Sequence, residues 1–100
     1  MDNEVIKIAN LFKDKIEGII PFKMLILFGS YARGTAKPGS DIDLAVIVDK
    51  LDNNFLALSG KMYEFVRDID LRLEPILLDL ENDRSGFVKS IIKNGIRIDG

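Results

Sequence analysis

Two short, almost uninterrupted apolar runs constrain this 100-residue chain more than any other feature. The first spans residues 22–28, and the second occupies most of residues 41–48, which read Asp-Ile-Asp-Leu-Ala-Val-Ile-Val. Apolar runs of this length predict buried strands, and they are too short to span a bilayer. The polar beginning of the second segment places the N-terminal end of its strand at a solvent-filled cleft.

Helix and strand patterns flank the two runs. Apolar residues three or four positions apart predict amphipathic helices over residues 4–20, 55–67 and 84–93, the first of which Pro21 stops. A short helix is expected over 31–33, with Ser30 as its cap. Further strands are expected over 69–78 and 96–98. Gly95 stands where a helix C-cap glycine belongs. This order predicts an α/β fold, of the α+β kind, in which helices flank a small mixed β-sheet.

Two of these elements carry specific expectations. In the strand over 69–78, Ile69, Leu71 and Leu73 are expected on one face, opposite the polar side chains. In the helix over 84–93, Phe87 and Ile92 are expected to point inward with the other apolar residues.

The composition excludes several kinds of chemistry. The chain has no Cys and no His, which removes thiolate catalysis, disulfides, the commonest general base and the commonest transition-metal ligand. Catalysis would have to use carboxylates, hydroxyls, Lys, Arg and hard cations such as Mg²⁺. A net charge of −2 with no basic stripe argues against general nucleic-acid binding.

The length and the N-terminus set expectations for organisation and location. We expect residues 1–100 to form a single domain, because the length suits one compact unit and no linker interrupts it. The first residues do not resemble a secretory signal, and no run is long enough to span a membrane. We therefore expect a cytoplasmic protein that does not associate with membranes.

The segment that follows the first apolar run suits phosphate binding. It reads Gly29-Ser30-Tyr31-Ala32-Arg33-Gly34, so that a strand leads into a glycine and then into the start of a helix. Free backbone N–H groups and the Ser30 hydroxyl would face a bound phosphate there, and Gly29 allows close approach of the backbone. Arg33 lies one turn further on and can reach a polyphosphate.

The start of the second run suits metal binding. Asp41 and Asp43 are two positions apart on a strand, so both carboxylates project from the same face. Carboxylates held close together repel unless a cation lies between them, and Mg²⁺ commonly joins carboxylates to substrate phosphates. Two such ions can activate a hydroxyl and neutralise a pyrophosphate leaving group. Ser40 orients Asp41 or caps the loop, and we group it with the nucleotide-binding residues.

Together these motifs resemble the signature of the DNA polymerase β-type nucleotidyltransferase superfamily. The motif itself spans Gly29 to Val48. The order of the elements extends the resemblance to nearly the whole chain, which is similar to the minimal nucleotidyltransferases encoded beside HEPN-domain proteins. The resemblance implies a fold like the palm of polymerase β. It implies that Gly29 and Ser30 hold a nucleoside triphosphate. It also implies that Asp41 and Asp43 bind two Mg²⁺ ions, for which Mn²⁺ can substitute.

The resemblance also implies a third carboxylate on the neighbouring strand. The phrase Arg72-Leu73-Glu74-Pro75 resembles the pattern of that branch, with the carboxylate just before proline, and favours Glu74 as a metal ligand and catalytic residue. Asp70 is the alternative ligand. The alternative role for Glu74 is that of a solvated strand residue paired with Arg72.

Three functions follow from the resemblance. The first is transfer of AMP from ATP onto a hydroxyl of a helical HEPN-type partner protein, so that the chain acts as an antitoxin. The second is an antitoxin that binds its partner without catalysis. The third is a small-molecule nucleotidyltransferase of the antibiotic-modifying kind, which would need a second helical domain. The intact set of Ser30, Asp41, Asp43 and Glu74 favours catalysis.

Overall fold

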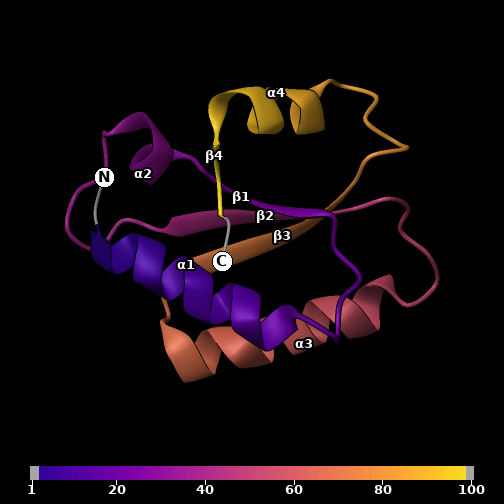
Figure 1. Ribbon diagram of the computed structural model, residues 1–100, viewed down its shortest axis with the longest axis horizontal. Helices are drawn as coiled ribbons and strands as arrows, with labels where there is room; N and C mark the ends of the chain where they lie inside the picture. The colour runs from indigo at the N-terminus through magenta and orange to yellow at the C-terminus, as the bar shows by residue number, and fades with distance from the viewer. Residues whose placement is uncertain (1–2, 99–100) are drawn as a thin grey trace.

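The computed structural model describes residues 3–98, which form four helices and four strands (Figure 1). In chain order these are α1 (Asn3–Ile16), β1 (Met24–Phe28), α2 (Ser30–Arg33), β2 (Ile42–Val48), α3 (Phe55–Ile69), β3 (Leu73–Asp79), α4 (Phe87–Asn94) and β4 (Ile96–Arg97). Every expected element is present, and the predicted alternation of helices and strands is confirmed.

The strands form one mixed sheet in the order β3-β2-β1-β4. Strand β1 is antiparallel to both β2 and β4, whereas β2 and β3 are parallel and are joined through α3. A parallel pair needs such a crossover connection, because the chain must return to the same end of the sheet. The α+β fold with a small mixed sheet, predicted from the sequence, is confirmed.

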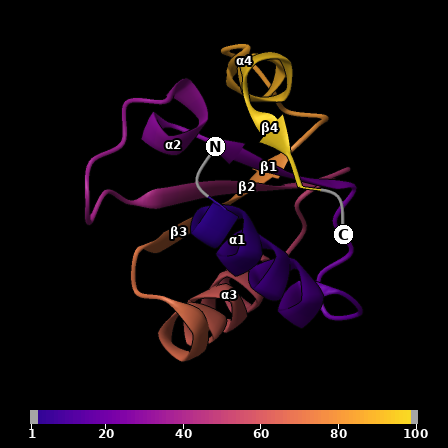
Figure 2. The ribbon, with the colours of Figure 1, turned by 60° about the vertical axis from the view of Figure 1, so that its left-hand side comes forward.

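The core has two parts, one on each face of the sheet. Successive strand residues point to opposite faces, so that Leu44 and Val46 join the cluster formed with α1 and α3, while Ala45 and Ile47 join the cluster formed with α4. Figures 1 and 2 show α1 and α3 on one side of the sheet and α4 on the other. Cover on both faces is the reason why residues 44–48 of β2 form a continuous apolar run.

The third strand begins later than its alternation predicts. Helix α3 continues to Ile69, and β3 starts only at Leu73. Between them the Asp70 carboxylate accepts the backbone N–H of Arg72 at 2.9 Å, and the Asp70 carbonyl accepts the N–H of Leu73 at 3.2 Å. This turn leaves Leu71 79% exposed, so the prediction that it lies on the apolar strand face is wrong.

The last helix also begins later than expected. The helix starts at Phe87 with Gly86 as its N-cap residue, and the carboxylate of Asp83 accepts the N–H groups of Val88 and Lys89 in the first turn at 2.9 and 3.0 Å. Phe87 is 46% exposed and Ile92 37%, so they do not point fully inward as predicted.

Smaller differences concern the helix ends. Helix α1 ends at Ile16, four residues before the predicted end, and a turn with Gly18 at φ 81° follows. Gly29, not Ser30, is the cap of α2. Gly95 is the C-cap residue of α4 as expected, although its backbone is extended there.

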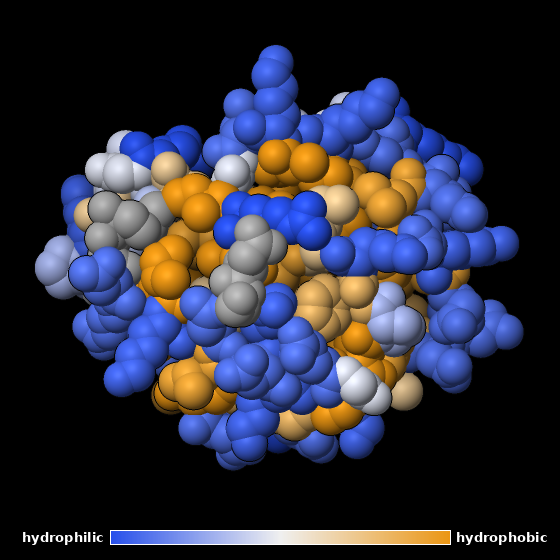
Figure 3. All heavy atoms as spheres, in the orientation of Figure 1, coloured by the Kyte–Doolittle hydropathy of each residue, from blue (hydrophilic) through white to orange (hydrophobic). Residues whose placement is uncertain are grey.

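The surface mixes polar and apolar side chains. In Figure 3, apolar atoms are visible between charged side chains on the face that carries α1, β4 and α4. Leu11 of α1, 46% exposed, is one of the apolar residues that the fold leaves at the surface. Among residues 3–98, none of the helices has the length and apolar character needed to cross a membrane.

Candidate active site

The topology brings the predicted site residues to one edge of the sheet. Because β1 is antiparallel to β2, and β2 is parallel to β3, the end of β1 lies beside the starts of the other two strands. Phe28 pairs with Asp43, and Asp43 pairs with Glu74. Neighbours in register point to the same face, so the Asp43 and Glu74 side chains project together from the face that α4 partly covers.

Gly29 is required where the chain turns from β1 into α2. Its φ is 76° and its ψ is −151°, a conformation found almost only for glycine. A Cβ atom at Gly29 would overlap the Oδ2 atom of Asp43. The missing side chain of Gly29 therefore makes room for the Asp43 carboxylate directly against the backbone.

Helix α2 presents polar groups beside that carboxylate. It is a single turn, so the N–H groups of Ser30, Tyr31 and Ala32 have no acceptor within the helix. Its end is fixed by Gly34 at φ 76° and by the N–H of Thr35, which donates to the Ser30 carbonyl at 3.0 Å. The sequence folds this way because glycines stand on both sides of the turn, and the result is a cluster of donors at the edge of the sheet.

Negative charge is concentrated at Asp43. Burial raises the pKa of this half-buried carboxyl above its ordinary value, and the charges of Asp41 and Glu74 raise it further. The positive charge of Arg33 acts in the opposite direction. Two acidic side chains, Asp41 and Glu74, and one basic side chain, Arg33, therefore lie within electrostatic reach of Asp43.

The arrangement suits a hard cation, although the carboxylates do not enclose one. No group of three acidic side chains among residues 3–98 is already gathered into a metal-binding cluster. Asp41 and Glu74 are exposed, and within the described part of the chain neither side chain has a hydrogen-bond or ion-pair partner. Their oxygen atoms are the ligands that Mg²⁺ prefers, and a cation would relieve the repulsion at Asp43.

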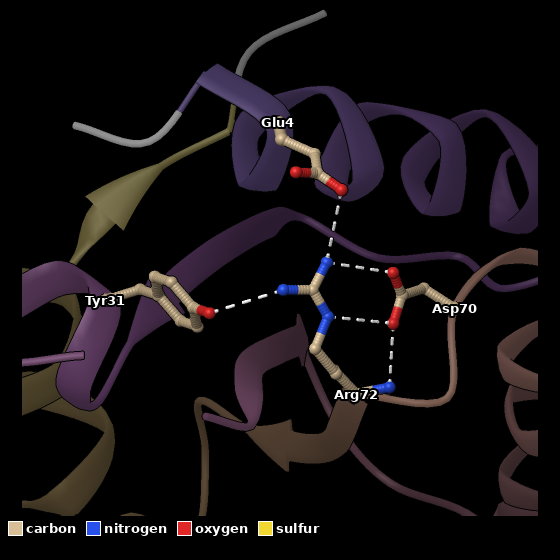
Figure 4. A network of polar contacts seen from close by, with 4 residues as sticks. All are labelled: Glu4, Tyr31, Asp70 and Arg72. Carbon is tan, nitrogen blue, oxygen red and sulfur yellow. Dashed lines mark hydrogen bonds and ion pairs between the residues drawn. The ribbon is translucent and has the colours of Figure 1, made fainter. Parts of the chain in front are cut away.

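Asp70 lies in a different network (Figure 4). Its carboxylate accepts from Nε and Nη2 of Arg72 at 3.1 and 3.0 Å, and this pairing lowers the Asp70 pKa. Arg72 also donates to the Tyr31 hydroxyl at 3.4 Å and lies 3.5 Å from Glu4. Asp70, the alternative third carboxylate, is thus paired with Arg72, whereas Glu74 is not.

Ser40 has a local partner. Its hydroxyl oxygen accepts the backbone N–H of Lys37 at 2.8 Å, and its own N–H donates to the Lys37 carbonyl at 2.9 Å. These bonds close the loop that leads into β2, as the sequence suggests for a local cap.

Helix α4, which the sequence did not link to the candidate site, lines a hollow beside it. A hollow of about 460 Å³ lies between α2, the end of β1 and α4, and Phe87, Ser90 and Asn94 line it beside Gly29 and Arg33. The helix predicted over 84–93 includes Ser90 but ends before Asn94, and only the packing of α4 on the sheet places both residues at the hollow.

Two curated relatives share part of the sequence. The Methanocaldococcus jannaschii protein MJ1305, which is named as a protein adenylyltransferase, is 41% identical over 59 residues. These residues cover 55% of this chain and 40% of that protein. The protein adenylyltransferase MntA of Shewanella oneidensis is 46% identical over 48 residues, covering 47% of this chain and 32% of MntA. The matched segments thus span less than half the length of either relative.

Solved structures match over almost the whole chain. A Sulfolobus solfataricus protein superimposes with a TM-score of 0.68 at 22% identity, covering 94% of this chain and 78% of that one, and supports the fold. A toxin-antitoxin solved with AMP-PNP matches with a TM-score of 0.58 at 30% identity, covering 99% of this chain and 74% of that one. The family described as Polymerase beta, Nucleotidyltransferase matches residues 6–99. This chain therefore belongs to the polymerase beta nucleotidyltransferase family.

Proposed function

We propose that this chain transfers AMP from ATP, with Mg²⁺, onto a hydroxyl group of a partner protein, and that residues 1–100 act as a single nucleotidyltransferase domain. The observation that carries this proposal is the register that aligns the end of β1 with Asp43 and Glu74, with Arg33 within electrostatic reach of Asp43. Phosphate-binding donors and acidic side chains thus meet at one edge of the sheet, as phosphoryl-type transfer requires.

The triphosphate is held by the turn after β1. The N–H groups of α2 and the Ser30 hydroxyl donate to phosphate oxygens, and Gly29 permits their close approach. Arg33 adds a charge-assisted contact. Ser40 supports this binding from a distance by closing the loop that positions Asp41.

The acidic residues Asp41, Asp43 and Glu74 hold two Mg²⁺ ions, or Mn²⁺ in their place. When bound, the ions neutralise charge on the phosphates and make the acceptor hydroxyl more acidic. Asp41 and Glu74 are exposed and unpaired among the described residues, so that their side chains can rotate toward a cation without breaking an ion pair.

The reaction is a displacement at the α-phosphorus. The acceptor oxygen forms a bond to that phosphorus, the bond to the oxygen that bridges to the β-phosphate breaks, and pyrophosphate leaves. The Glu74 carboxylate lies beside Asp43 on the neighbouring strand and takes the proton of the hydroxyl. Asp41 and Asp43 keep the triphosphate in position.

The acceptor is a partner protein, namely a helical HEPN-type toxin for which this chain is the cytoplasmic antitoxin. The toxin-antitoxin structure with AMP-PNP supports both the nucleotide and the partner, and MntA supports protein adenylylation. The competing functions are an antitoxin that only binds its toxin, and transfer to a small molecule.

The test uses the full chain with the product of the neighbouring reading frame. Calorimetry should show ATP binding with Mg²⁺ and none with chelator, and label from α-labelled ATP should appear on the partner. Asp43→Asn should abolish labelling, whereas Asp49→Asn, an exposed aspartate just after the other end of β2, should not. Neutralisation of the partner that survives Asp43→Asn would favour simple binding. Equal ATP affinity with and without Mg²⁺ would contradict the metal-dependent mechanism.

A further inference from the structure

The hollow between α2 and α4 adjoins the proposed triphosphate site. Gly29 and Arg33 belong to its lining, and Gly29 lies directly against the Asp43 carboxylate. Its volume of about 460 Å³ falls within the range of small-ligand pockets. A nucleotide with its phosphates at the Gly29 turn would therefore have this hollow within reach of its nucleoside.

The wall of the hollow offers an aromatic surface. Phe87, the first residue of α4, is 46% exposed, and its ring meets that of Phe28 edge to face, with centroids 6.3 Å apart and an interplanar angle of 88°. This contact packs the Phe87 ring against the end of β1, while nearly half of the residue stays exposed. Exposed aromatic rings beside a phosphate-binding site are suited to stacking with nucleobases.

One turn of α4 supplies a polar edge. Asn94 Nδ2 donates to the Ser90 hydroxyl oxygen at 3.3 Å, a long and exposed hydrogen bond that a ligand can replace. The carboxamide of asparagine pairs with adenine through two hydrogen bonds, because adenine presents a donor beside an acceptor. Guanine presents two acceptors at the corresponding edge and does not match it.

From this lining we infer that the hollow is the nucleobase subsite, in which Phe87 stacks on the base and Asn94 selects adenine over guanine. The inference rests on the proposed function and adds to it the residues that recognise the base. It also explains why Phe87, an apolar residue at the start of α4, remains exposed beside the sheet edge that carries Asp43 and Glu74.

The experiment compares ATP, GTP and inorganic triphosphate, which has no base, by calorimetry with Mg²⁺. We expect Phe87→Leu to weaken ATP roughly tenfold and to leave inorganic triphosphate unchanged. Asn94→Ala should reduce a preference for ATP over GTP from roughly tenfold to near unity. Ile92→Ala is the matched control, because it truncates an exposed apolar residue of the same helix outside the hollow.

The outcomes separate the two ideas. If inorganic triphosphate and ATP bind equally well and Phe87→Leu alters neither, the base subsite is wrong and the proposed function stands. If neither ligand binds the wild-type chain, the proposed function fails and the subsite with it. Weakening of inorganic triphosphate by Phe87→Leu would also contradict the inference, since it would show a general disturbance of the site. Melting curves of each variant show whether α4 remains folded.

Discussion

The Nη1 atom of Arg72 lies 3.4 Å from the hydroxyl oxygen of Tyr31, and this contact joins two segments 41 positions apart in the sequence. Tyr31 is in α2, next to Ser30, and Arg72 leads into the strand that carries Glu74. The Arg72 carbonyl also accepts the N–H of Ile42 at 2.7 Å, at the start of β2. Arg72 therefore holds together the three segments that form the candidate site.

Replacing Arg72 should loosen that junction. Arg72→Lys keeps the charge but cannot donate to Asp70 and Tyr31 together, because lysine lacks the planar, forked guanidinium. We expect the melting temperature to fall by roughly 4–8 °C, which corresponds to about 1 kcal/mol in a domain of this size. Tyr31→Phe should have a smaller effect. Lys23→Ala, which removes an exposed ion pair with Asp49, is the control and should change little.

Gly29→Ala should inactivate the chain. The new Cβ would overlap the Asp43 carboxylate, and the backbone conformation of Gly29 adds strain of about 1–3 kcal/mol. Gly34→Ala is the control, because Gly34 has the same φ of 76° but open space around its Cβ position. AMP transfer and melting temperature should be measured for both variants. A Gly29→Ala variant with wild-type transfer would mean that Asp43 need not lie against the backbone.

The strands were predictable from the sequence where burial alone determines the pattern. Strands β1 and β2 are covered on both faces, so their apolar runs needed no tertiary information. The start of β3 was not predictable in this way. Ile69, Leu71 and Leu73 alternate as a strand does, but the hydrogen bond from Arg72 N–H to Asp70 forms a turn there.

The candidate site was predictable in part. Gly29, Asp41 and Asp43 stand out because their spacing within one local segment suggests the chemistry. The local phrase around Glu74 favoured that residue, but its position beside Asp43 depends on the register between two strands. Phe87 was expected to be buried because it is apolar, and only the packing of α4 beside α2 shows that it lines a hollow.

The charge on Asp43 should oppose folding of the metal-free chain. Its pKa is raised above the ordinary value of 3.8, so the native state binds the proton more tightly than the unfolded state does. Stability is then lost as pH rises from about 3.8 through the raised pKa. We expect Asp43→Asn to melt higher than wild type at neutral pH in chelator, with a difference that shrinks as pH falls toward 3.8. Mg²⁺ should stabilise wild type more than the variant; equal stabilisation would argue against Asp43 as a ligand.

Asp79 should stabilise the opposite end of the sheet without affecting transfer. Its carboxylate accepts the N–H groups of Leu51 and Asn82 at 2.8 and 2.9 Å, and the bond from Leu51 is the main cause of its lowered pKa. A lowered pKa means that this stability is present above the ordinary value of 3.8 and is lost as pH falls through the folded pKa. Asp79→Asn should lower the melting temperature at neutral pH and flatten its fall in acid. Loss of AMP transfer at full folding would contradict this assignment.

The last prediction separates the two candidates for the third carboxylate by the kind of defect each causes. Glu74→Gln should cut AMP transfer by orders of magnitude with little change in ATP affinity, because Glu74 acts chiefly on the attacking hydroxyl. The melting temperature should also change little, because the Glu74 side chain is exposed and unpaired among the described residues. Asp70→Asn should show the reverse pattern. It breaks the ion pair with Arg72, and so lowers the melting temperature, while transfer by the folded fraction continues. Both variants need transfer, ATP binding and melting curves measured on the same preparation. A dead but stable Asp70→Asn together with an active Glu74→Gln would move the third carboxylate to Asp70, and normal transfer by both would remove it from the mechanism.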